Sequence, residues 1–254
     1  MKVRSQSSSI PKKRSKGLSA PASPKDWSAK QILDELRSLG TQGNIDGMTR
    51  FGIRADDVYG VSKPKLDALA KRIGKNHSLA LVLWSTGNHD ARILAGLIAD
   101  PRQITSAHMN LWARDFNNWD VCDGTCCHLF VFAKSAWPRA LLWTSRKDEF
   151  QKRAGFALVA YLAYRDNTAA DLQFEEFLKI IEREAWDDRN FVRKAVNWAL
   201  RNIGKRNLRL NRAAVASALR LQKSDSRAAR WIAADALREL RSAAVQSRLR
   251  RKKT

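Results

Sequence analysis

Trp119 and Asp123 combine the two side-chain types with the greatest potential for chemistry in this sequence. They stand four residues apart, so a helix through this segment would place both side chains on one face. A carboxylate can stabilise a developing positive charge or orient water, and the face of a tryptophan ring attracts the same charge. The spacing is also that of an ordinary core tryptophan and a surface carboxylate, so spacing alone does not decide between the two.

A second segment mixes cations with an aromatic residue. Lys194, Trp198 and either Arg201 or Asn202 fall along one face of a helix predicted after Asp188, an arrangement typical of surfaces that follow a phosphate backbone. The alternative is that Trp198 packs in the core and the cations form a solvated edge. Most other tryptophans are expected to be packing residues or helix-end anchors rather than ligand contacts, and we place them in the core, including Trp84, Trp112, Trp137, Trp143 and Trp186.

Three cysteines and a histidine crowd into residues 122–128 and raise the question of a metal site. Thiolates and imidazoles are the ligands that zinc prefers. On a helix, however, Cys127 and His128 would point away from Cys122 and Cys126, and the chain has no further cysteine to complete a set of four ligands. We therefore expect no metal, and reduced, buried cysteines. The remaining histidines have no Ser or Cys partner at a recognisable spacing, so a nucleophilic triad has no support.

The excess of positive charge indicates a polyanionic partner. The 254 residues hold 47 Lys and Arg against 25 Asp and Glu, a net charge of +22. Seven cations lie in residues 1–25, which contain no acid, and five lie in residues 248–254, so the region between them keeps +10. A basic folded part favours phosphate contacts and salt-sensitive binding of nucleic acid. We interpret residues 1–25 as a disordered basic arm and residues 248–254 as a basic tail.

Several protein classes are excluded by features that the sequence lacks. No run of about eighteen uncharged apolar residues exists, and the first thirty residues lack the apolar stretch of a secretory signal, so we expect neither a membrane protein nor a secreted one. Neither G-x-G-x-x-G nor G-x-x-x-x-G-K-[ST] occurs, which disfavours dinucleotide binding and nucleotide hydrolysis. The expected location is the cytoplasm.

The elements that would position these residues are helices in a repeat. An acidic residue precedes a basic residue by five positions, and then an Ala-rich apolar helix, at Asp148, Asp188 and Asp225, with a looser copy at Asp90. The three regular starts are 40 and 37 residues apart, the period of HEAT-like helix pairs. We predict an all-α fold over residues 26–247, a HEAT-like superhelix (α-solenoid) of five to six helix pairs whose second helices line the concave side. A globular helix bundle is the alternative.

Helix boundaries are most readable near the N-terminus. Ser28 is expected to cap a helix that carries apolar residues at three- and four-residue steps from Ile32 to Leu39. Ser62, followed by Pro64, is expected to open another helix, which Gly74 ends.

Together the ordered motifs resemble the AlkD-type DNA alkylation repair glycosylases. The strings that carry the resemblance are Tyr59-Gly-Val, Trp119-Asp-Val-Cys-Asp123, Arg153-Ala-Gly-Phe-Ala-Leu, Asn190 through Asn207 and Ala229 through Leu237, and they span roughly residues 30 to 240. The resemblance implies a HEAT-like solenoid with a concave, cationic DNA-binding face. It further implies that Trp119 and Trp198 lie against the deoxyribose of the lesion, that Asp123 is the catalytic carboxylate, and that Arg153 lies beside the phosphate.

The activity implied by the resemblance is that of a monofunctional DNA N-glycosylase of the bacterial cytoplasm, associated with the nucleoid when bound to DNA. It would act on double-stranded DNA with alkylated purines, as a monomer, with water as co-substrate and without metal or organic cofactor. The cations expected to hold the DNA are Arg193, Lys194, Arg201, Lys205, Arg206 and Arg230.

A single carboxylate also indicates the substrate class. An N3- or N7-alkylated purine is already cationic and leaves as a neutral base, so it needs no general acid. Asp120 lies off the face of Asp123 and is expected to cap or support the helix. The resemblance implies capture of the DNA backbone without a deep base pocket. The alternatives are a HEAT-repeat protein that binds nucleic acid without cleaving it, and a protein-interaction scaffold.

Overall fold

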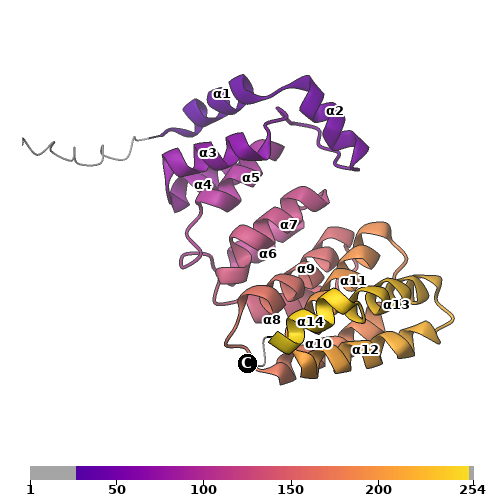
Figure 1. Ribbon diagram of the computed structural model, residues 1–254. Helices are drawn as coiled ribbons and strands as arrows, with labels where there is room; N and C mark the ends of the chain where they lie inside the picture. Colours follow the sequence, from indigo (N-terminus) through magenta and orange to yellow (C-terminus); the bar gives the residue numbers. More distant parts are fainter. Residues whose placement is uncertain (1–26, 252–254) are drawn as a thin grey trace, which may run out of the picture.

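The computed structural model describes residues 27–251, so the expected basic arm at residues 1–25 lies outside the described residues. All regular elements of this part are helices (Figure 1). The first seven α-helices are α1 (Ala29–Leu39), α2 (Gln42–Arg50), α3 (Lys63–Ile73), α4 (His77–Ser85), α5 (His89–Ile98), α6 (Ser106–Arg114) and α7 (Trp119–His128). They are followed by η1 (Phe130–Phe132), α8 (Ala136–Trp143), α9 (Glu149–Arg165), α10 (Asp171–Glu184), α11 (Asn190–Gly204), α12 (Leu208–Gln222), α13 (Arg227–Leu240) and α14 (Ala243–Arg251).

The helices stack as successive pairs. One layer is continuous, because α3 packs on α5, α5 on α7, α7 on α9, α9 on α11 and α11 on α13. Each helix of this layer also packs against the helix before it in its pair, as α5 does against α4, α9 against α8 and α13 against α12. Figure 1 shows the stack as one curved row from α1 to α13. The prediction of an all-α solenoid of helix pairs is confirmed.

Polar contacts between neighbouring repeats span 29 to 38 residues, which is shorter than the predicted period in the N-terminal half and equal to it further along the chain. Arg139 donates to Asn110 across 29 residues, and the indole of Trp84 donates to Asp115 across 31 residues. Further along the chain, the Asn197 amide donates to Asp235 across 38 residues. Each such bond satisfies a polar group at the junction of two repeats, where an unpaired group would be costly. Neighbouring repeats are therefore joined by polar contacts as well as by apolar packing.

The predicted helix boundaries near the N-terminus are confirmed. Ser28 caps α1 in a capping box with Gln31. Ser62 is the N-cap residue of α3, and Gly74 ends it with a positive φ of 74°, a conformation that glycine adopts without strain.

The acidic residues that mark the repeat differ in where they lie relative to their helices. Asp148 caps α9 by accepting a hydrogen bond from the backbone N–H of Gln151, as the pattern suggests. Asp90, by contrast, is buried inside α5 and accepts hydrogen bonds from three consecutive backbone N–H groups at residues 59–61. Asn88 takes the capping role there. The N-cap residues of α11 and α13 are Arg189 and Ser226, each one residue after the acid of its copy, so of the four acids only Asp148 caps its helix.

The core contains most of the tryptophans that were expected in it. Trp84 and Trp112 stack with ring centroids 4.0 Å apart, and both are buried with Trp143. Trp186 was also expected in the core, and this prediction is wrong. It follows α10, is 64% exposed, and lies with its ring centroid 5.2 Å from the ammonium of Lys152.

The expected basic tail at residues 248–254 begins within a helix, and its residues 252–254 lie outside the described residues. Helix α14 continues to Arg251, and its Leu249 is buried, so residues 248–251 belong to the folded body. None of the described helices is long and apolar enough to cross a membrane.

Candidate active site

Asp123 and Arg153 form an ion pair between two neighbouring helices of the continuous layer. Asp123 lies in the second turn of α7, which starts where Asn118 accepts hydrogen bonds from two backbone N–H groups. Arg153 comes from the second turn of α9. Its Nε donates to one carboxylate oxygen at 2.9 Å and its Nη2 donates to the other at 2.6 Å. This two-pronged geometry fixes the carboxylate in one orientation.

Burial and charge act in opposite directions on the pair. The side chain of Asp123 is 16% exposed and that of Arg153 is 8% exposed. Burial raises the pKa of Asp123 above its ordinary value, and the neighbouring guanidinium opposes that rise. Burial also disfavours the charged guanidinium, but Asp123 raises the pKa of Arg153 overall. Arg153 donates one N–H group to each oxygen of Asp123, and this is the arrangement in which an ionised carboxylate binds a guanidinium. We therefore describe Asp123 as negatively and Arg153 as positively charged.

Arg153 has a further contact that joins a third helix. Its Nη1 donates to the backbone carbonyl of Phe191, at the start of α11, at 2.7 Å. The guanidinium therefore lies among α7, α9 and α11, beneath Asp123 and away from open solvent. In the structure its contacts hold the carboxylate, whereas the family resemblance implied a position beside a phosphate.

Trp119 is the first residue of α7 and lies one turn before Asp123. Its ring is half-buried, and its Nε1 donates to the backbone carbonyl of Phe51 at 3.0 Å, just after α2. A hollow of about 470 Å³ lies beside it, and both Trp119 and Asp120 contribute to its lining. Asp120 accepts a hydrogen bond from His89 Nε2 at 3.2 Å, which agrees with the expected supporting role.

Trp198 lies on α11, and its side chain contacts α9. Its half-buried ring meets that of Tyr161 edge to face, with centroids 4.9 Å apart. Burial raises the pKa of Tyr161, and the nearby Cys127 and Asp123 add to the rise. The phenol therefore stays neutral and lies within electrostatic reach of Asp123. The sequence analysis did not identify Tyr161 or Phe51 as site residues. Tyr161 follows Arg153 by two helical turns and so shares its face of α9, and this spacing could have indicated it.

The cations predicted to bind DNA differ in how free they are. Lys194 is exposed and has no hydrogen bond or ion pair within residues 27–251. Arg193 lies over the Trp231 ring, 4.6 Å from its centroid. Arg201 and Lys205 both pair with Glu239, at 2.6 and 2.7 Å.

Two more of the predicted cations bind backbone carbonyls. Arg206 donates to Ala163, in the last turn of α9, at 3.3 Å and to Ala169, between α9 and α10, at 2.9 Å. Arg230 donates to the carbonyls of Ser224 and Asp225, both at 2.8 Å. Of the six predicted cations, Lys194 is the one with the most freedom to contact a phosphate.

The cysteines beside the site are packed against α9. Cys122 and Cys126 are buried, and their thiols point at the backbone carbonyls of Phe150 and Ala154, at 3.6 and 3.8 Å. Burial raises the pKa of Cys122 well above its ordinary value, so it is a neutral thiol. Within the described residues no group of three or more His, Cys, Asp or Glu side chains is arranged to hold a metal ion.

Comparison with known proteins identifies the class. Residues 32–247 match the DNA alkylation repair enzyme family, and the chain belongs to that family. A solved structure described as "a new family of proteins related to the HEAT-like repeat DNA glycosylases with affinity for branched DNA structures" has a TM-score of 0.74 at 22% identity. The alignment covers 88% of this chain and 96% of that chain, so the fold is that of the HEAT-like repeat DNA glycosylases. No curated protein matches the chain significantly.

Proposed function

We propose that this chain is a monofunctional DNA N-glycosylase that releases cationic N3- and N7-alkylpurines from double-stranded DNA. The observation that carries the proposal is the Asp123 carboxylate, held through both oxygens by Arg153 and preceded by Trp119 one turn earlier on α7. Membership of the DNA alkylation repair enzyme family and a net charge of +22 support a DNA substrate.

Cleavage would proceed by departure of the base and addition of water. The bond between C1′ of the deoxyribose and the purine nitrogen breaks, and its electron pair stays with the purine, which leaves neutral because it began as a cation. Positive charge then develops on the sugar, and Asp123 stabilises it or orients the water that adds to C1′. The water loses its proton to solvent, and an abasic site remains.

The two tryptophans would supply apolar, electron-rich faces on either side of the sugar. The negative face of an indole attracts a cation by about 0.5 to 2 kcal/mol, depending on desolvation. Trp119 is tethered through its Nε1 to Phe51, and Trp198 is supported by the ring of Tyr161, so neither ring has to be ordered when DNA binds.

Arg153 acts in this mechanism as a positioning residue. Its guanidinium counteracts the effect of burial on the pKa of Asp123 and so keeps the carboxylate charged. The cations Arg193, Lys194, Arg201, Lys205, Arg206 and Arg230 are proposed to contact phosphates, with Lys194 the most available and the ion-paired ones requiring rearrangement. We propose a monomer, because one chain supplies all four site residues.

Binding of DNA without hydrolysis is the second candidate, and one observation favours it. The positive charge of Arg153 already compensates Asp123, which reduces the field that the carboxylate exerts on a sugar cation. The similar solved structure is described by its affinity for branched DNA structures. The same cations would then hold phosphates, and the tryptophans would only stack or pack.

Release of 7-methylguanine from methylated duplex DNA under single-turnover conditions separates the two candidates. We expect free base with the native chain, and a loss of about a hundredfold or more in Asp123→Asn, the usual cost of removing one preorganised electrostatic group. Trp119→Ala should also slow release. The matched control is Asp188→Asn, an exposed carboxylate outside the site. Equal rates in all four proteins, or no free base from any, would exclude the glycosylase and leave the binding protein.

A further inference from the structure

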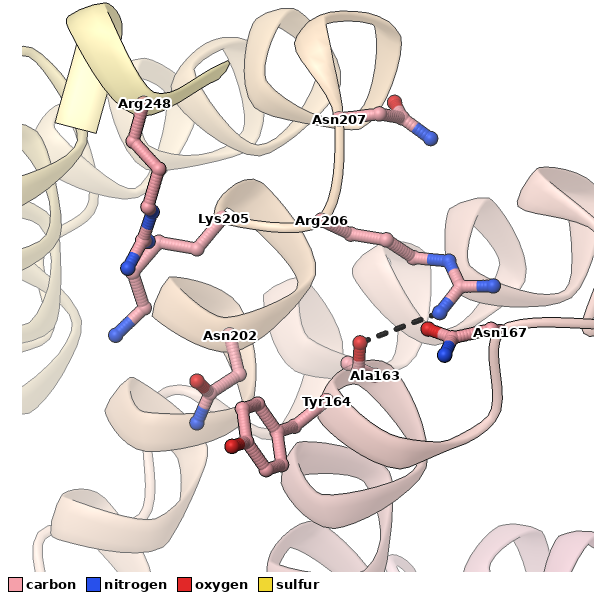
Figure 2. A pocket seen from close by; sticks show the side chains of 8 residues that line it. All are labelled: Ala163, Tyr164, Asn167, Asn202, Lys205, Arg206, Asn207 and Arg248. Atoms are coloured by element: carbon pink, nitrogen blue, oxygen red, sulfur yellow. Dashed lines mark hydrogen bonds between the residues drawn. The ribbon is translucent and has the colours of Figure 1, made fainter. Parts of the chain in front are cut away.

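A second hollow lies where the C-terminal ends of α9 and α11 meet α14. Its volume is about 760 Å³, within the range of small-molecule sites. We call it the α14 pocket. It is lined by Ala163, Tyr164, Asn167, Asn202, Lys205, Arg206, Asn207 and Arg248, and Figure 2 shows these side chains.

The lining of the α14 pocket is positively charged. It includes three cations, Lys205, Arg206 and Arg248, and no acidic residue. Lys205 pairs with Glu239 outside the lining, and Arg206 donates to one carbonyl in the last turn of α9 and to one between α9 and α10, so each of these two also has a structural role. Arg248 is exposed and has no hydrogen bond or ion pair within residues 27–251. Figure 2 shows it extending from α14 toward Lys205, which leaves a positive charge available to an anion.

Tyr164 gives the pocket an aromatic surface. Its side chain is 73% exposed, an unusual position for a large ring, and it makes no ring contact or hydrogen bond to the described chain. In Figure 2 the ring lies beside Asn202. The amides of Asn202 and Asn167 have no hydrogen-bond partner within residues 27–251 and can both donate and accept.

Cations, an exposed ring and free amides together fit one kind of ligand. The cations attract a phosphate, the ring stacks on a planar base, and the amides can pair with base edges. Inside a duplex the faces of the bases are covered by their neighbours, so a base there cannot stack on Tyr164. The complete set of contacts therefore requires an unpaired nucleotide.

The α14 pocket is distinct from the candidate active site. Tyr164 and Arg153 are both on α9 and stand eleven residues apart. At a rise of about 1.5 Å per residue, this places them roughly 16 Å apart along the helix. A duplex whose lesion lies at Asp123 could thus have an unpaired end in the α14 pocket.

We propose that the α14 pocket binds a nucleotide of an unpaired DNA strand, with a phosphate at Arg248, Lys205 and Arg206 and a base on Tyr164. The site goes beyond the proposed glycosylase activity and does not depend on it. It makes DNA with a single-stranded tail a better ligand than blunt duplex.

Binding is measured by fluorescence anisotropy at one fixed salt concentration, since phosphate contacts depend on salt. The probes are a blunt duplex and the same duplex with a 5′ or 3′ tail of about six thymidines, within the site sizes of single-strand-binding folds. We expect the native chain to prefer a tailed duplex by about tenfold, the scale of one stacked base. Tyr164→Ala and Arg248→Ala should each remove most of this preference, while binding to blunt duplex is retained.

Matched variants test the chemistry of each contact. Tyr164→Phe keeps a ring and should keep the preference. Arg250→Ala removes the same charge from an exposed position of α14 outside the pocket and should also keep it. The proposal is overturned if the native chain binds tailed and blunt duplexes equally, or if Arg250→Ala loses the preference as fully as Arg248→Ala. If thymidine monophosphate competes as effectively as an oligothymidine strand, the ligand of the pocket is a free nucleotide and the proposal of a DNA strand is wrong.

The experiment distinguishes this site from the proposed function. Asp123→Asn should bind tailed DNA with the native preference, whether or not the native chain releases bases. Tyr164→Ala should release 7-methylguanine from blunt duplex at the native rate if the chain is a glycosylase.

Discussion

Arg153 donates to both carboxylate oxygens of Asp123, from Nε at 2.9 Å and from Nη2 at 2.6 Å, across the junction of α9 and α7. The carboxylate proposed to face the sugar thus has its orientation and its charge set by a neighbouring repeat. A fixed carboxylate costs little reorganisation as charge develops on a substrate, and this is the advantage of a preorganised site.

Replacing Arg153 should move the pH dependence of base release. Burial raises the pKa of Asp123 and the guanidinium opposes that rise, so Arg153→Met should raise the pKa further. Because the ionised carboxylate is the active form, the rate would then fall at a higher pH as the solution is acidified. Arg153→Lys, which keeps a charge but lacks the planar fork, should shift the acid limb less.

Single-turnover rates across the acid range give this shift directly. Arg209→Met is the control, since Arg209 pairs with Glu175 on the surface at 2.9 Å and is far from Asp123 in the sequence. An acid limb at the same pH in Arg153→Met, Arg209→Met and the native chain would show that Arg153 does not tune Asp123.

The sequence was sufficient for the helical repeat but only partly for the site. Trp119 and Asp123 were placed on one face because a four-residue spacing within one helix has a fixed geometry. The contact between Asp123 and Arg153 spans 30 residues and depends on how α7 packs against α9, which spacing does not give. The same limit applies to Lys205, whose pairing with Glu239 is set by the packing of α11 against α13.

Gly155 should be essential for the packing of α9 against the end of α8. A Cβ at this position would lie 2.5 Å from the backbone nitrogen of Thr144 and 2.8 Å from the carbonyl carbon of Trp143. Backbone atoms cannot rotate away, so Gly155→Ala should lower the free energy of unfolding by about 1 to 3 kcal/mol, as overpacked cores do.

Gly47→Ala is the matched control for Gly155→Ala. A Cβ at Gly47 in α2 meets nothing within 4 Å, so the better helix propensity of alanine should raise the free energy of unfolding by about 0.5 to 1 kcal/mol. Urea denaturation of both variants measures the difference. A Gly155→Ala protein as stable as the native chain would mean that α8 and α9 are less tightly packed than the structure shows.

Lys152 should be required for stability through its buried ion pairs. Its ammonium lies 2.8 Å from Glu184 and 2.9 Å from Asp187, and all three side chains are largely buried. Lys152→Met would leave Glu184 and Asp187 paired only with Arg183 and Arg189, and we expect a loss of about 1.5 to 3 kcal/mol in the free energy of unfolding. Lys179→Met, which removes an exposed pair with Glu176, should change it by less than about 1 kcal/mol. Similar losses in the two variants would contradict a special role for Lys152.

The same cluster should contribute to the pH dependence of stability. Burial alone would raise the pKa of Asp187, but hydrogen bonds from Arg189 and Lys152 lower it to about 2. Because the folded pKa lies below the unfolded one, this contribution is present above pH 4 or so, and is lost as the pH falls toward about 2. Asp187→Asn should show a shallower loss of stability than the native chain over that range. If the free energy of unfolding falls equally in Asp187→Asn and in the native chain from neutral pH to pH 2, Asp187 makes no such contribution.

The three thiols should differ sharply in reactivity, because the structure gives them different surroundings. Cys122 and Cys126 are buried against α9, and burial raises the pKa of Cys122, so neither offers an exposed thiolate. Cys127 is half-buried and receives a contact from Arg165 at 3.5 Å. Ellman's reagent should therefore label one thiol quickly in the native chain and all three in denaturant, and Cys127→Ser should abolish the fast phase. Fast labelling of two or three thiols in the native chain would show that α7 separates readily from α9, and would place the fixed geometry of Asp123 in question.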